Sequence, residues 1–179
     1  MPILETERLI LRDFVASDWD ALNAFLSDPA VTRFMHFASW DEGRRRAWLT
    51  SLVQEASTPQ RDAYNWAITL RSNGLLIGWL IVGRSRHTTE EGMRECGCGY
   101  ALNQHAWGQG YMPEALQAAF AYAFTVLETR LIHAECEREN TASARVMQKC
   151  GMHYEGTIYD DDGLGNWAHR DRFVIIAAS

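Results

Sequence analysis

A chain of 179 residues, of which 47% are hydrophobic and seven are tryptophans, is long enough to bury a core as one domain without disulfides or bound metal. Its formal net charge of −6 excludes the basic surface typical of nucleic-acid-binding proteins and favours cationic amines or basic protein tails as partners. No apolar stretch approaches the ~20 residues of a membrane span, and the N-terminal residues do not resemble a signal peptide, so we expect a cytoplasmic protein without a membrane partner.

The first half of the chain predicts a series of strands and helices. The expected strands are residues 8–14, 64–70 and 75–82. Ser17 is a plausible N-cap for one helix and Asp41 for a second. The pair Asn73-Gly74 separates the last two of these strands and is a strong signal for a hairpin.

The second half predicts a strand, a helix, another strand, another helix and two final strands. The expected elements are strands 98–102, 131–137, 152–159 and 167–176, and helices 111–128 and 141–149. Gly151 is well placed to end the second of these helices in the left-handed conformation. With no internal repeat or linker, the order of elements predicts a mixed α+β fold in a single domain, residues 1–179.

The junction between strand 98–102 and the helix from residue 111 has the features of an anion site. Gly108 and Gly110 lack a Cβ, so a ligand can approach the backbone, and the first amides of a helix have no acceptor within it. Pro113 fits only the first helical turn, which places the positive end of the helix dipole beside these glycines. A tight loop that binds nothing is the alternative, and the spacing matches neither a P-loop nor a dinucleotide fingerprint.

The cysteines and histidines do not predict a metal site. Cys96, Cys98, Cys136 and Cys150 lack the Cys-x-x-Cys spacing of zinc sites, and the six histidines include no His-Glu-x-x-His motif. We therefore expect reduced thiols and no metal.

Three segments, in order, resemble the GNAT acyl-CoA N-acetyltransferases, and among them the RimJ/RimL-like branch that acts on ribosomal-protein N-termini. They are LETERLILR at residues 4–12, WGQGYMPEA at 107–115, and ENTASARV at 139–146 followed by KCG at 149–151. The likeness covers nearly the full chain. His105 stands where the diphosphate loop of the family usually has Gln or Arg, and Met152 stands where Phe commonly follows the glycine.

This resemblance implies the GNAT fold, a mixed sheet of about seven strands that is splayed between its fourth and fifth strands, with helices on both faces. Strands 98–102 and 131–137 would part to admit the pantetheine arm of acetyl-CoA, the co-substrate. The implied cofactor-binding residues lie on strand 98–102, in the glycine-containing loop, and at the starts of helices 111–128 and 141–149. They are Tyr100, Ala101, Leu102, His105, Trp107, Gly108, Gln109, Gly110, Tyr111, Met112, Asn140 and Ser143.

The same resemblance implies direct acetyl transfer to a primary amine, with no covalent enzyme intermediate. Glu135 is the leading base, because some family members carry a glutamate five residues before the asparagine that matches Asn140; otherwise it is one of three solvated side chains on a strand face. Glu95 and the acidic residues 160–162 are further options. Ser143 could donate to the departing sulfur or could satisfy amides of its own helical turn.

We expect a protein N-terminal α-amine as the acceptor. At pH 7 such an amine, with a pKa near ~8, costs about 1 kcal/mol to deprotonate, whereas lysine costs roughly 4 to 5 kcal/mol. A small amine (polyamine, aminoglycoside or amino acid) and a non-catalytic acyl-CoA sensor are the alternatives, and a homodimer is left open. Three tryptophans could line an acceptor pocket or belong to the core: Trp40, Trp48 and Trp66.

Overall fold

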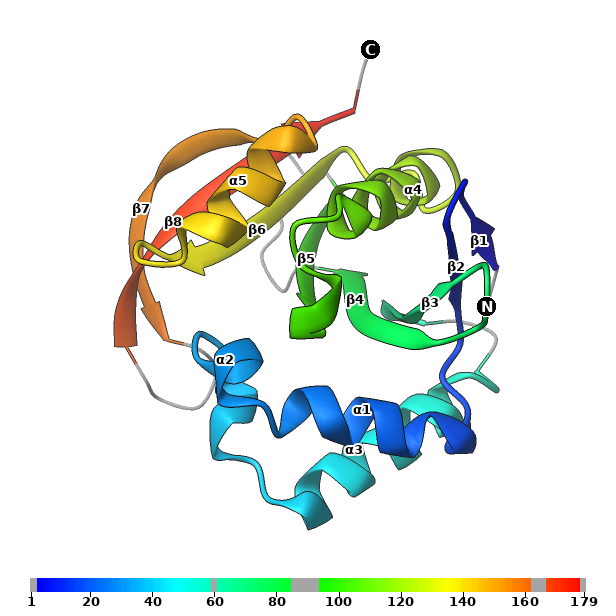
Figure 1. Cartoon of the computed structure of the whole chain (residues 1–179). Helices are drawn as coiled ribbons and strands as arrows, with labels where there is room; N and C mark the ends of the chain where they lie inside the picture. The colour runs from blue at the N-terminus through cyan, green and yellow to red at the C-terminus, as the bar shows by residue number, and fades with distance from the viewer. Residues whose placement is uncertain (1–2, 59–60, 85–93, 162–166, 178–179) are drawn as a thin grey trace.

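The computed structural model of the chain describes residues 3–58, 61–84, 94–161 and 167–177. The described residues form one mixed sheet of eight strands in the order β1-β2-β3-β4-β5-β6-β8-β7 (Figure 1). The strands are β1 (Leu4–Glu5), β2 (Leu9–Arg12), β3 (Ala63–Leu70), β4 (Leu76–Arg84), β5 (Glu95–Leu102), β6 (Leu131–Glu137), β7 (His153–Asp161) and β8 (Trp167–Ile176). The mixed α/β fold predicted from the sequence is confirmed. The additional strand is β1, whose two residues are too few to show an alternating pattern.

Helices cover both faces of this sheet, with α1, α2 and α3 on one side and α4 and α5 on the other (Figure 1). They are α1 (Trp19–Leu26), α2 (Pro29–Thr32), α3 (Glu42–Glu55), α4 (Tyr111–Thr125) and α5 (Thr141–Lys149), with short 3-10 helices η1 (Ala16–Asp18), η2 (His36–Ser39) and η3 (Gln104–Ala106). Within the described ranges, none of the helices is both long enough and apolar enough to cross a bilayer.

The helix ends follow the expected caps, with two exceptions. Asp41 accepts a hydrogen bond from the Arg44 amide at 2.7 Å, and Gly151 follows α5 at φ +83°. Ser17, in contrast, lies inside η1, so α1 begins at Trp19, one residue later than a cap at this position would place it. The helix predicted to reach residue 128 ends at Thr125, because Glu128 adopts a left-handed conformation at φ +52°.

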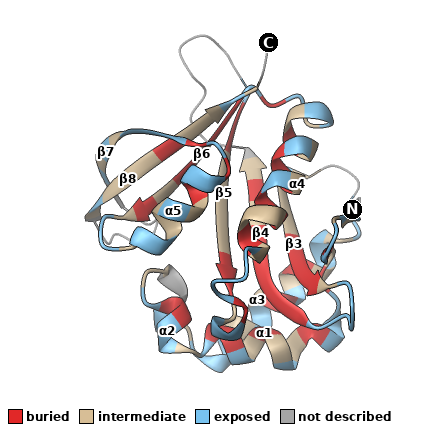
Figure 2. Ribbon diagram, turned by 45° about the horizontal axis from the view of Figure 1, so that its top comes forward, coloured by how far each residue is buried: buried red, intermediate tan, exposed pale blue. Residues whose placement is uncertain are grey.

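Each face of the sheet has its own hydrophobic core, and Figure 2 shows the buried residues gathered along the central strands. The helix α4 contributes a buried stripe at three-and-four spacing: Met112, Ala115, Leu116, Ala119, Phe120 and Ala123. The alanines in this stripe let the helix lie close to the strands beneath it. This close packing holds the first turn of α4 at the end of β5.

The sheet is continuous except between β5 and β6. These two strands are parallel and pair only from Glu95 to Gly97 on β5, opposite residues 131–133 of β6. Beyond Gly97, β5 continues to pair with β4 and β6 continues to pair with β8, but the two strands no longer pair with each other. The predicted splay is therefore confirmed, and it lies after the fifth strand once β1 is counted.

A substitution at Gly78 tests how closely β4 and β5 pack. A Cβ at this position would lie 2.4 Å from the carbonyl oxygen of Ala101 and 2.6 Å from a methyl group of Leu102. We expect Gly78→Ala to lower the free energy of unfolding by about 1 to 3 kcal/mol, because backbone must move to admit the methyl group.

Denaturant titration measures this change, and Gly43→Ala is the matched control. Gly43 lies in the first turn of α3, and the nearest atom to a Cβ there is a side-chain oxygen of Asp41 at 3.4 Å. The control should be neutral or slightly stabilising, since alanine favours helix. Equal stability of the two variants would contradict the inferred close packing.

Candidate active site

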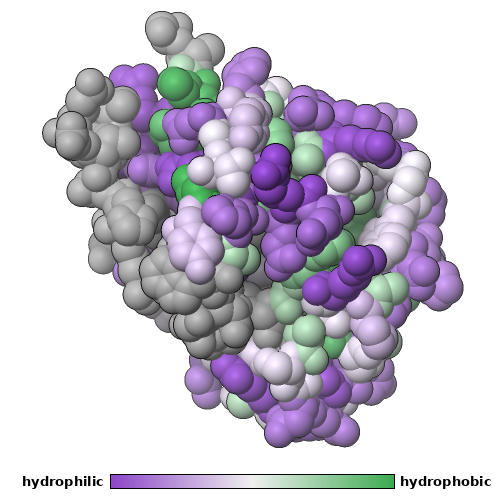
Figure 3. Space-filling model, turned by 90° about the vertical axis from the view of Figure 1, so that its left-hand side faces the viewer, coloured by the Kyte–Doolittle hydropathy of each residue, from purple (hydrophilic) through white to green (hydrophobic). Residues whose placement is uncertain are grey.

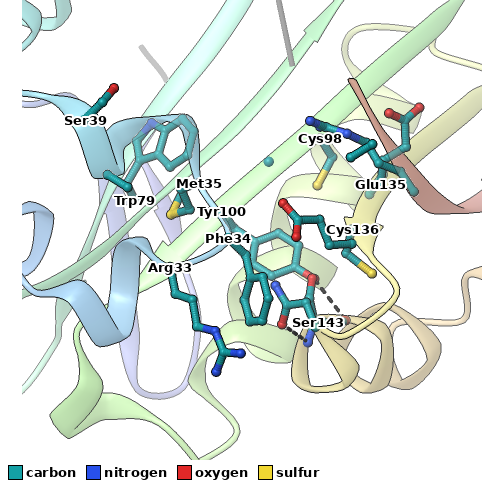
Figure 4. Close-up of a pocket in the computed structure, with 17 residues that line it drawn as sticks. Arg33, Phe34, Met35, Ser39, Trp79, Cys98, Tyr100, Glu135, Cys136 and Ser143 are labelled. Carbon is teal, nitrogen blue, oxygen red and sulfur yellow. Dashed lines mark hydrogen bonds between the residues drawn. The ribbon is translucent and has the colours of Figure 1, made fainter. Parts of the chain in front are cut away.

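A cavity of about 440 Å³, called the cleft below, opens where β5 and β6 part. Its walls come from the segment after α2, from β4, β5, β6 and β8, and from the start of α5: Arg33, Phe34, Met35, Ala38, Ser39, Trp79, Cys98, Gly99, Tyr100, Ala134, Glu135, Cys136, Glu137, Asn140, Ser143, Ala168 and Arg170. Figure 4 shows Arg33, Phe34 and Met35 on one side of the cleft and Cys98, Glu135 and Cys136 on the other. The cleft therefore connects the α1–α3 face of the sheet with the α5 face.

The pairing of β5 with β4 determines which backbone groups of β5 face the cleft. The amide of Asn103 donates to the carbonyl of Ile77 at 2.8 Å, so in this antiparallel ladder Ala101 also directs its backbone groups toward β4. Tyr100, one residue before Ala101, directs its amide and carbonyl to the opposite edge, into the gap beside β6. Of the backbone groups predicted to bind a cofactor, those of Tyr100 are therefore available and those of Ala101 belong to the sheet.

Leu102 faces the same gap with only one free backbone group. Its carbonyl accepts a hydrogen bond of 2.9 Å from the indole nitrogen of Trp107. This bond closes the end of β5 against the loop that follows and fixes the position of Trp107. The amide of Leu102 remains available at the cleft side of the strand.

The glycine loop, residues 107–111, leads from η3 into α4, and its first amide, that of Trp107, donates to the Gln104 carbonyl at 3.1 Å. Gly108 and Gly110 have φ values of +75° and +79°, which favour glycine. Within the described part of the chain, none of the amides of residues 108–112 donates a hydrogen bond to a protein acceptor. His105 is exposed, and its carbonyl accepts a bond from the Gln109 side chain at 2.8 Å. The loop thus has the free amides that the sequence predicted.

Two hydroxyl groups meet at the α5 side of the cleft. The hydroxyls of Tyr100 and Ser143 lie 2.8 Å apart, and the Tyr100 hydroxyl also lies 3.2 Å from the Ser143 carbonyl (Figure 4). Asn140 caps α5 by accepting a bond from the Ser143 amide at 3.2 Å. Burial raises the pKa of Tyr100, so this phenol keeps its proton at neutral pH. The Tyr100 side chain was not identified from the sequence, because nothing local indicates that β5 and α5 meet.

Glu135 is a partly buried carboxylate in the cleft wall rather than a solvated side chain. Its Oε1 lies 3.5 Å from Nδ1 of His133 and 3.7 Å from a guanidinium nitrogen of Arg172. The interaction with His133 is the main reason that the pKa of Glu135 is lowered; burial acts in the opposite direction, and Arg172 and Arg170 add to the lowering. Glu135 is therefore ionised at neutral pH.

The other candidate carboxylates are placed differently. Glu95 is buried below the cleft, where β5 and β6 still pair, and bonds to Arg172 at 2.6 Å. Asp160 and Asp161 extend β7 by pairing with β8, whereas the sequence placed them in a turn; Asp162 lies outside the described residues. The turn residues predicted the end of this hairpin but not how far its strands extend.

The thiols in the cleft are poor nucleophiles. Burial raises the pKa of Cys98 and raises that of Cys136 to about 11, so both are protonated at neutral pH. None of the four cysteines forms a disulfide. In the described residues, no cluster of three or more histidine, cysteine or acidic side chains is positioned to hold a metal ion. The chemistry that the cleft offers is the carboxylates of Glu135 and Glu137, the hydroxyls of Tyr100 and Ser143, and two protonated thiols.

The tryptophan in the cleft wall is Trp79, which sequence reasoning missed. Trp66 is fully buried in the core, and Trp40 and Trp48 pack behind the cleft, where the Trp48 ring centroid lies 5.5 Å from that of Trp79. Trp79 lies beside Gly99, where a Cβ would approach the indole to 3.6 Å. Figure 3 shows the molecule from the left-hand side of Figure 1. Hydrophilic side chains cover most of this face, and hydrophobic ones gather toward its middle.

Comparison with known proteins agrees with this geometry. The acetyltransferase (GNAT) domain family matches residues 8–153. The chain is 31% identical over 160 residues to an uncharacterized N-acetyltransferase, p20, of Bacillus licheniformis, which covers 89% of this chain and 87% of that protein. Among solved structures, a GNAT-family acetyltransferase of Bacillus anthracis has a TM-score of 0.82, with 25% identity over 98% of both chains.

RimJ of Mycobacterium smegmatis, solved in complex with CoA-disulfide, has the same fold, with a TM-score of 0.78 and 22% identity over 98% of this chain and 86% of that one. The segment that matches the family contains both the glycine loop and the two strands that part to form the cleft. The chain therefore belongs to the GNAT family of N-acetyltransferases and is an acyltransferase enzyme.

Proposed function

We propose that this enzyme transfers the acetyl group of acetyl-CoA directly to the α-amine of a protein N-terminus. The observation that carries this proposal is the position of Glu135, an ionised carboxylate in the wall of the cleft with its pKa held low by His133. A weak base of this kind suits an amine with a pKa near ~8, which is already partly neutral at pH 7. It is poorly suited to lysine or a polyamine.

The residues beside the cleft fit the two parts of the coenzyme. The free amides of residues 108–112, at the positive end of α4, would hold the diphosphate. The amide and carbonyl of Tyr100 and the amide of Leu102, all on the unpaired edge of β5, would bond to the amides of the pantetheine arm. A Cβ at Gly108 would have no protein atom within 4 Å, which leaves room for a ligand against the backbone.

In the proposed reaction the amine nitrogen bonds to the acetyl carbon and the carbon–sulfur bond breaks. Glu135 accepts the proton that the amine loses, directly or through one water. The hydroxyl pair of Tyr100 and Ser143, 2.8 Å apart, lies at the start of α5 and supplies a proton to the departing sulfur. The protonated thiols of Cys98 and Cys136 agree with a transfer that uses no acyl-cysteine.

Replacing the proposed base gives the first test. Glu135→Gln should lower kcat/KM about 100-fold at pH 7, since the amide cannot accept the proton. The loss should shrink above about pH 9, where an α-amine is neutral without help. The pH dependence of kcat/KM measures this, and Glu137→Gln, on the same strand and also in the cleft wall, is the control. A Glu135→Gln profile parallel to that of the parent would remove Glu135 from this role.

The proposed diphosphate site has a matched pair of glycines. Gly108 and Gly74 have φ values of +75° and +72°, and a Cβ at either would meet no atom within 4 Å. Valine at either position should therefore cause a similar loss of stability from backbone strain, of about 1 to 2 kcal/mol. Only Gly108→Val should weaken acetyl-CoA binding, by about tenfold or more in calorimetry. Unchanged affinity for Gly108→Val would contradict the site.

A panel of acceptors tests the substrate class. At pH 7, a peptide with a free N-terminus should react with a kcat/KM about 200-fold higher than the same peptide with a blocked N-terminus and one lysine, because a larger fraction of its amine is neutral. Release of the CoA thiol measures the rate. Faster reaction of spermidine, an aminoglycoside or a free amino acid would establish the small-amine alternative instead.

A further inference from the structure

We propose that Arg8 is a positioning residue for the coenzyme, which acts by holding the Gln109 carbonyl and so directing the Gly110 amide toward the diphosphate. The inference rests on the proposed binding of acetyl-CoA to the glycine loop. It concerns a residue that is about 100 positions away in the sequence and lies next to α4 in space, where β1 and β2 pack against that helix (Figure 1).

The central contact is a hydrogen bond of 2.9 Å from a guanidinium nitrogen of Arg8 to the carbonyl of Gln109. A peptide group is planar, and its carbonyl and amide point in opposite directions. The carbonyl of Gln109 and the amide of Gly110 belong to the same peptide group. Because Arg8 fixes the carbonyl on one side of the loop, it also fixes the Gly110 amide on the other side, where that amide is free.

Without such a bond this peptide group would be the least restrained part of the loop. Gly110, whose amide belongs to this peptide group, has a positive φ value, and glycine tolerates a wide range of backbone angles. A rotation of the peptide between Gln109 and Gly110 would replace an amide by a carbonyl at the anion site. The partial negative charge of a carbonyl oxygen would then repel the diphosphate.

Arg8 is itself held in place from three directions by Glu114, in the first turn of α4. Its backbone amide donates to Oε1 of Glu114 at 2.9 Å, and its guanidinium lies 2.7 and 2.6 Å from Oε2. The Thr6 hydroxyl donates to Oε1 at 2.5 Å, and the guanidinium carbon lies 4.7 Å from the Tyr111 ring centroid. These contacts determine the direction of the remaining guanidinium N–H groups.

The same ion pair removes an electrostatic conflict. Burial would raise the pKa of Glu114, but the bonds from Thr6 and Arg8 outweigh this and lower it, so the side chain is a carboxylate. A carboxylate in the first turn of α4 would repel a bound diphosphate. The Arg8 guanidinium neutralises this charge, so loss of Arg8 would both release the loop and expose a competing anion.

The test compares acetyl-CoA with S-acetyl-pantetheine, which lacks the diphosphate. In Arg8→Gln the Kd for acetyl-CoA, measured by calorimetry, should rise about tenfold. The Kd for S-acetyl-pantetheine, measured by ligand-observed NMR, should stay at the parent value. Arg8→Lys retains the charge but cannot hold Glu114 and Gln109 together. Its Kd for acetyl-CoA should therefore lie between that of the parent and that of Arg8→Gln.

Arg12→Gln is the matched control. Arg12 lies at the end of β2, which begins one residue after Arg8, and makes a similar two-pronged ion pair, with Asp18 at 2.8 and 2.7 Å, but forms no hydrogen bond to the glycine loop. Arg12→Gln should lower the melting temperature and leave the Kd values for acetyl-CoA and S-acetyl-pantetheine unchanged. Arg8→Gln binding acetyl-CoA as the parent does, or weakening both ligands alike, would overturn the inference. A parent protein that does not bind acetyl-CoA would overturn the proposed function itself.

Discussion

The separation of β5 from β6 is the constraint on which the site depends. Three residues of β5, from Glu95 to Gly97, pair with β6 before the strands diverge. Each strand keeps its other neighbour, so the sheet loses pairing along one line only and its two cores stay intact. The unpaired edge of β5 then provides the polar backbone groups that an extended amide-containing ligand needs.

Much of the fold could be predicted from the sequence because its signals are local. The cap at Asp41, the left-handed Gly151 after α5, and the Asn73-Gly74 hairpin each depend on a few neighbouring residues. The free amides of the glycine loop follow from the same local rules. The split in the sheet is different: it came from resemblance to a family, since no periodicity indicates that two strands stop pairing.

The parts of the site that were missed depend on contacts between distant segments. The Tyr100 side chain reaches Ser143 across the gap, and Arg8, directly before β2, reaches the loop before α4. Among the carboxylates, Glu95 and Glu135 lie on neighbouring strands with similar surroundings in the sequence, and only the fold shows that Glu95 bonds to Arg172 below the cleft. The chemistry of the side chains restricts the candidate bases to a few carboxylates, and only their contacts in the fold distinguish Glu95 from Glu135.

The ion pair between Arg172 and Glu95 also has a consequence for binding energetics. It joins β8 to β5 across β6, within the stretch where β5 and β6 still pair, while the Tyr100–Ser143 contact joins the two halves beyond that stretch. Because these two contacts set the width of the cleft, the cleft is already open in the free enzyme. The conformational entropy of ordering it is therefore lost during folding, so association with an incoming molecule need not meet that cost again.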